Sequence, residues 1–199
     1  MRYFVSFIFG LVFMLAISNM AIANCKDHAL RQKVAETAKE EKVNENELLS
    51  IIAHESGCRY FAIAWNLPGK PETAKSKFFD HLSEAKLFAQ SLISTGRYRV
   101  DVGIGQINHE ANIRPKGWSL DEVLNPDIAL KRVAKILKER GWKNYHSSNP
   151  VLAKRWQQKA LMTLSSINGS SSNTTFSASS PLVVFINNPI KKSPPLVIF

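Results

Sequence analysis

Glu55 is the residue whose position most clearly suggests acid chemistry. It shares one face of an expected helix with three apolar side chains, which are Leu48, Ile51 and Ile52. Burial, and the negative end of the helix dipole, both favour the neutral form of a carboxyl group. A neutral carboxylic acid is the group that general-acid cleavage of a glycosidic bond requires. The alternative interpretation is a solvent-exposed glutamate at a helix end that pairs with Arg59.

The segment 101–108 (Asp-Val-Gly-Ile-Gly-Gln-Ile-Asn) is a second candidate. Gly103 and Gly105 suit a tight backbone beside a cleft, and Gln106 and Asn108 offer amide donors and acceptors for sugar hydroxyl and acetamido groups. The segment lacks the Gly-Lys-Ser/Thr of a phosphate loop and the third glycine of a dinucleotide fingerprint. It therefore suggests a sugar cleft rather than a phosphate site.

Asp101 is a possible second carboxylate for glycoside hydrolysis, which generally uses two. An aspartate before a glycine-containing turn also commonly accepts backbone hydrogen bonds, so a structural role is the favoured interpretation.

A metal site is not expected. His54-Glu55 begins like a zinc-protease helix, but Cys58 occupies the place of the second histidine, and the five histidines show no metal spacing. We also expect no cofactor.

These residues belong to a domain that the sequence predicts to be mainly α, with irregular loops or a small β element. We expect helices over 27–41, over 45–55 (capped by Asn44 and ended by Gly57), from Ser83 to Gly96, after Asn125-Pro126 to Gly141, and after Asn149-Pro150 through Leu161. Residues 59–80 and 97–118 are expected to be irregular. The sequence leaves open whether Trp118, Trp142 and Trp156 are core residues, which is the default, or platforms for sugar rings.

The composition fits one domain with a tail. The chain has 199 residues, of which 45% are hydrophobic, and this hydrophobic content excludes a fully disordered chain. Its formal charge of +10 suits an anionic partner. Nucleic acid is the least favoured such partner, because the basic residues are scattered without interleaved aromatic side chains.

The N-terminus has the layout of a secretory signal peptide over residues 1–23, with cleavage after Ala23 and no stable membrane span afterwards. Residues 24–166 form the predicted domain, and residues 167–199 a Ser/Asn/Pro-rich linker and flexible tail. In an exported protein Cys25 and Cys58 are expected to pair, although two separate buried thiols are the alternative.

Four motifs in this order resemble the lytic transglycosylases (SLT domains) of the lysozyme-like superfamily. They are His54-Glu55-Ser56-Gly57, residues 103–108, Asn125-Pro126 and Tyr145-His146-Ser147. The chain is similar in particular to the small exported forms that accompany conjugation and type IV secretion machinery. The resemblance covers roughly residues 25–165, and the signal-like N-terminus agrees with a periplasmic location.

The resemblance implies a lysozyme-like fold, with Glu55 as the catalytic acid and base and Ser56 orienting the carboxyl group or the substrate. It also implies that Gln106 and Asn108 line the cleft, that Gly103 and Gly105 let the backbone approach, and that Tyr145 places its hydroxyl near Glu55. Two departures stand out: Ile104-Gly105 replaces a Leu-Met pair and removes a side chain from the cleft wall, and His146-Ser147 replaces the commoner Asn-Ala-Gly.

The implied reaction cleaves the β-1,4 bond between N-acetylmuramic acid and N-acetylglucosamine in peptidoglycan and forms a 1,6-anhydro product. The implied partners are glycan strands and components of a secretion or conjugation apparatus. A hydrolytic muramidase that uses Asp101, and a non-catalytic wall-binding assembly factor, are the alternative hypotheses.

Overall fold

The computed structural model describes residues 24–147 and 149–169. The expected signal peptide, and the expected tail from residue 170 onward, lie outside these residues. The described chain is mostly helical and carries a small antiparallel sheet.

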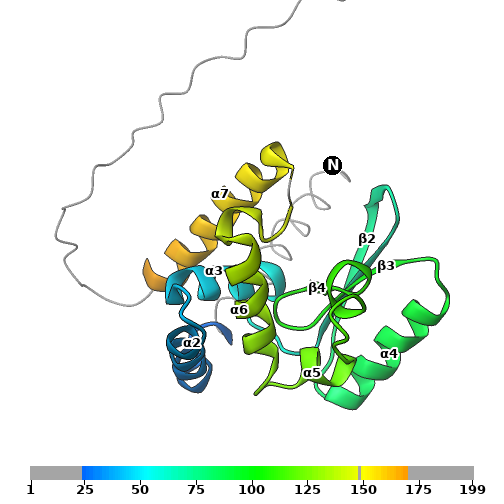
Figure 1. Ribbon diagram of the computed structural model, residues 1–199, viewed down its shortest axis with the longest axis horizontal. Helices are drawn as coiled ribbons and strands as arrows, with labels where there is room; N and C mark the ends of the chain where they lie inside the picture. The colour runs from blue at the N-terminus through cyan, green and yellow to red at the C-terminus, as the bar shows by residue number, and fades with distance from the viewer. Residues whose placement is uncertain (1–23, 148, 170–199) are drawn as a thin grey trace, which may run out of the picture.

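Four helices pack together on one side of the molecule, and the sheet lies with α4 on the other side (Figure 1). The four helices are α2 (His28–Glu41), α3 (Glu45–Ser56), α6 (Ala129–Arg140) and α7 (Pro150–Gly169). Helix α4 spans Leu82–Ser94 and the short α5 spans Leu120–Leu124.

Helix α3 holds the centre of the core and begins and ends where the sequence predicts. The Asn44 side chain accepts a hydrogen bond from the backbone N–H of Glu47 at 3.1 Å. Gly57 ends the helix in the left-handed conformation, with φ of 62°. Four large apolar side chains of α3 are completely buried, namely Leu48, Leu49, Ile51 and Ile52. This packing fixes the rotation of the helix and thereby the direction of Glu55.

The segments expected to be irregular contain the sheet. Its strand order is β2-β1-β3-β4, and the strands are β1 (Ala62–Leu67), β2 (Lys70–Phe78), β3 (Arg99–Val102) and β4 (Ile107–Asn108). Strand β2 is almost entirely exposed, so it lacks the apolar alternation by which a strand is recognised in sequence. A single π-helical turn, η1 (His109–Ile113), follows β4.

The start of α6 and the end of α7 differ from the prediction. Asn125 accepts a hydrogen bond from the Asp127 N–H within a turn, and α6 begins only at Ala129. Helix α7 begins at Pro150 as predicted, with Asn149 accepting from the N–H groups of Val151 and Leu152. Residues 167–169, expected in the linker, are the last residues of α7.

A disulfide joins Cys25 to Cys58, directly after the turn that ends α3. Both cysteines are buried in the core, so the covalent link anchors the start of the described chain to the end of α3. In the described part of the chain, no helix has the length and apolar character needed to cross a bilayer.

Candidate functional site

Glu55 lies in the last turn of α3 with only 13% of its side chain exposed. The indole Nε1 of Trp156 donates a hydrogen bond to Glu55 Oε1 at 2.7 Å, and His146 Nδ1 lies 3.3 Å from the same oxygen. Within the described residues, Oε2 makes no hydrogen bond. Arg59 does not pair with Glu55, because its guanidinium lies over the ring of Phe78 at 4.0 Å. One carboxyl oxygen is therefore fixed, and the other is free for a substrate.

Trp156 comes from α7 and is the centre of an aromatic cluster. Its ring stacks on that of His146, with centroids 6.1 Å apart and planes 7° apart. Trp142 lies 5.9 Å away and donates its own indole hydrogen bond to Ser50 Oγ at 2.9 Å. Trp156 is thus a core residue, as the sequence favours, and also a direct partner of Glu55.

A cavity of about 240 Å³ opens in front of Glu55. Its polar lining includes the amide side chains Gln106, Asn108 and Asn112, together with Asp101 and His146. Amides are suitable partners for sugar hydroxyl and acetamido groups because each donates and accepts. The two motifs singled out from the sequence, the end of α3 and the 101–108 segment, therefore meet at one cavity.

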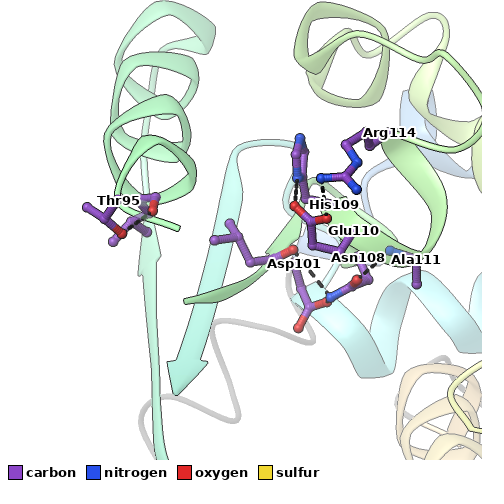
Figure 2. A network of polar contacts seen from close by, with 9 residues as sticks. Thr95, Asp101, Asn108, His109, Glu110, Ala111 and Arg114 are labelled. Carbon is purple, nitrogen blue, oxygen red and sulfur yellow. Dashed lines mark hydrogen bonds and ion pairs between the residues drawn. The ribbon is translucent and has the colours of Figure 1, made fainter. Parts of the chain in front are cut away.

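Asp101 faces this cavity and is held by Asn108 (Figure 2). Asn108 Nδ2 donates to Asp101 Oδ1 at 2.7 Å, while Asn108 Oδ1 accepts from the Ala111 N–H at 2.9 Å and caps η1. Burial raises the pKa of Asp101 above its ordinary value, and the hydrogen bond from Asn108 opposes this. The partner of Asp101 is thus a side-chain amide rather than the backbone groups that the structural interpretation invoked.

Ser56 and Gly103 are not among the residues that line the cavity. The buried hydroxyl of Ser56 lies 2.7 Å from the carbonyl oxygen of Ile104, so it ties the end of α3 to the 101–108 segment. Gly103 has φ of 79°, and a Cβ there would lie 2.3 Å from the Val123 carbonyl oxygen. Both residues hold the 101–108 segment in place.

Tyr145 lines the cavity, but its hydroxyl donates to the carbonyl oxygen of Gly105 at 2.9 Å rather than to Glu55. Burial raises the pKa of Tyr145 well above its ordinary value. A Cβ at Gly105 would lie 2.3 Å from Val133 Cγ2 and 2.8 Å from the Tyr145 hydroxyl. The absence of a side chain at Gly105 therefore makes room for Tyr145 and for Val133 of α6. Contrary to the expectation, it does not remove a side chain from the cleft wall.

The two histidines beside Glu55 respond oppositely to their surroundings. The hydrogen bond to Glu55 raises the pKa of the half-exposed His146, although burial opposes it. Burial lowers the pKa of His54, whose ring meets that of Trp156 edge-on at a centroid distance of 5.8 Å. The proton on His146 is accordingly linked to the charge on Glu55.

The basic side chains of the cavity, those of His146, Arg99 and Arg140, were not predicted from the sequence to lie near the acid. The sequence signal for His146 is its position directly after Tyr145, where His146-Ser147 replaces the residues more common in the tyrosine motif. Arg99 and Arg140 lie at the start of β3 and the end of α6, and no spacing along the chain indicates that they meet.

Comparison with known proteins finds no matching family model, no similar curated protein and no similar solved structure. Among the described residues, no group of three His, Cys, Asp or Glu side chains is arranged to hold a metal ion.

Proposed function

We propose that this chain is an exported, lysozyme-like peptidoglycan lytic transglycosylase with Glu55 as its catalytic acid and base. The observation that carries the proposal is the largely buried carboxyl group of Glu55, with one oxygen bound by Trp156 and the other free toward an amide-lined cavity. The resemblance of four ordered motifs to this family supports the same assignment.

The proposed reaction needs one carboxyl group. With Oε1 held by Trp156, the proton on Oε2 passes to the oxygen that links N-acetylmuramic acid to N-acetylglucosamine, and the bond from that oxygen to C1 of the muramic residue breaks. The acetamido group of the substrate stabilises the positive charge at C1. The Glu55 carboxylate then takes the proton of the muramic 6-hydroxyl, whose oxygen bonds to C1 and closes the 1,6-anhydro ring. Water is not consumed.

Amide side chains suit the orientation of such a substrate. Gln106 is held in a strained left-handed conformation, with φ of 46°, and its side-chain nitrogen donates to the Gly103 carbonyl at 2.8 Å. Its side-chain oxygen is then directed by a fixed amide plane, which suits a sugar hydroxyl donor. Asn108 is similarly immobilised by Asp101 and the start of η1.

Mass spectrometry of muropeptides released from purified sacculi tests the proposal. Residues 24–199 are compared with Glu55→Gln, and Glu45→Gln at the exposed start of the same helix is the matched control. We expect anhydro products, lighter than hydrolytic ones by one water, from the unaltered protein and from the control, and none from Glu55→Gln. Release by Glu55→Gln at the unaltered rate would refute the assignment.

A hydrolytic muramidase is the second candidate, and the exposure of Asp101 to the same cavity favours it. In that reaction Asp101 would act on a water or on C1, and the products would have full-mass reducing ends. Asp101→Asn would then abolish release, whereas it would leave anhydro products intact under the first proposal. Binding of sacculi without release by any variant would favour a non-catalytic assembly factor.

The biological setting belongs to the same proposal. The signal-like residues 1–23 support export to the periplasm, and the resemblance supports local opening of the wall during assembly of a secretion or conjugation apparatus.

A further inference from the structure

The cavity at Glu55 continues into a second, wider depression of about 730 Å³. Arg99, Arg140 and His146 line both spaces, so the depression begins where the acid-containing cavity ends. The rest of its lining consists of Asn144, Ser147 and Leu152, and includes no acidic side chain.

The two guanidinium groups carry charge that the described carboxylates do not pair. Residues 24–147 and 149–169 contain eight ion pairs, and neither Arg99 nor Arg140 takes part in any of them. Arg140 Nη2 donates to Asn112 Oδ1 at 2.6 Å, which fixes the direction of its side chain. The positive charge of His146 adds to theirs whenever its ring is protonated.

The resulting cleft has a charge gradient. Glu55 and Asp101 line only the cavity, whereas Arg99 and Arg140 line both the cavity and the depression. Where a peptide stem is attached, the lactyl carboxyl group of the muramic residue is an amide, so the glycan backbone is uncharged and the stem carries the carboxylates. Guanidinium groups bind carboxylates with paired, charge-assisted hydrogen bonds.

We propose that this depression, the arginine subsite of Arg99 and Arg140, binds a carboxylate of the peptide stem attached to the muramic residue at Glu55. The inference rests on the proposed function and deepens it, because it makes a peptide-bearing glycan the preferred substrate. Asn144 and Ser147 offer hydrogen bonds to the peptide amides, and Leu152 offers an apolar contact.

The test compares binding of glycan strands that bear peptide stems with the same strands after their stem carboxylates have been converted to amides with a carbodiimide and ammonium. Binding is measured by co-sedimentation, in the Glu55→Gln background, so that it does not depend on cleavage. The variant is Arg99→Gln/Arg140→Gln, and the control is Arg97→Gln, an exposed arginine that lines neither space. We expect the double variant to bind the untreated strands about tenfold more weakly, as loss of a charge-assisted contact predicts, and to bind the amidated strands as the protein with unaltered arginines does.

Equal weakening on both kinds of strand would overturn the proposal, since the arginines would then serve the cleft or Asp101 rather than the stem. Unchanged binding to both would overturn it as well. Absence of cleavage by the unaltered protein would refute the proposed function alone, because the binding comparison would still give its own answer.

Discussion

Trp156 Nε1 and Glu55 Oε1 are 2.7 Å apart, although 101 positions of chain separate the two residues. The hydrogen bond connects the last turn of α3 to the first half of α7, two helices that pack along each other. It makes the orientation of the proposed acid dependent on a tryptophan that is itself 4% exposed. The function of Glu55 and the packing of the helical side of the molecule are thus coupled through one indole.

Replacing this indole by a ring without a donor separates the two roles. Trp156→Phe should lower kcat about tenfold, because a hydrogen bond of about 1.4 kcal/mol orients the carboxyl group. Trp142→Phe is the matched control, since it removes an indole bond of 2.9 Å to Ser50 from the same cluster. Both variants should lose stability by about 1–3 kcal/mol, measured by denaturant unfolding. Equal losses of kcat in the two variants would show that packing alone matters.

The titration of His146 provides a test of the geometry without substrate. The hydrogen bond to Glu55 raises the His146 pKa, Asp101 adds to this, and burial and Arg99 act in the opposite direction. Glu55→Gln should therefore lower the pKa of His146, and Arg99→Gln should raise it, as followed by NMR of the imidazole protons. Shifts of the reverse sign, or none, would contradict the placement of His146 between these groups.

The same raised pKa predicts a pH-dependent contribution of His146 to stability. Because the folded pKa exceeds the ordinary value of 6.5, the contribution is fully present below that value and is lost as the pH rises through the folded pKa. His146→Gln should therefore destabilise the protein more at pH 5.5 than at pH 9. The difference should be at most about 1 kcal/mol, because half of the side chain is exposed and solvent screens the pair.

Gly105 should tolerate no side chain while Val133 and Tyr145 keep their places. Gly105→Ala forces a methyl group to within 2.3 Å of Val133 Cγ2, and we expect a loss of about 1–3 kcal/mol in the free energy of unfolding. Gly169→Ala, with open space around the Cβ position, is the control and should be neutral or slightly stabilising. Val133→Ala added to Gly105→Ala should restore part of the loss. A stable Gly105→Ala protein would contradict this packing.

Most of the helical frame could be predicted from local signals. The Asn44 cap, the apolar face of α3 and Gly57 are neighbours in sequence, and they fix both the helix and the direction of Glu55. A small β element was among the expectations, but its strands could not be placed, because β2 is polar and exposed and is stabilised by its pairing with β1 instead of by burial.

The partners of the site residues could not be predicted from the sequence. The Tyr145 hydroxyl donates a hydrogen bond to the Gly105 carbonyl oxygen, because the absent Cβ at Gly105 leaves room for it. The Trp156 contact with Glu55 depends on how α7 lies along α3, which no local pattern specifies. Likewise Asn125, which has the sequence of a helix cap, caps a turn, and the helix starts later at Ala129.

The most direct test of single-carboxylate chemistry at Glu55 is digestion of sacculi in water labelled with heavy oxygen, followed by mass spectrometry of the muropeptides. We predict anhydro products without label from the unaltered protein and from Asp101→Asn, and no products from Glu55→Gln. Labelled reducing ends that disappear in Asp101→Asn would contradict the account and assign the reaction to a two-carboxylate hydrolase.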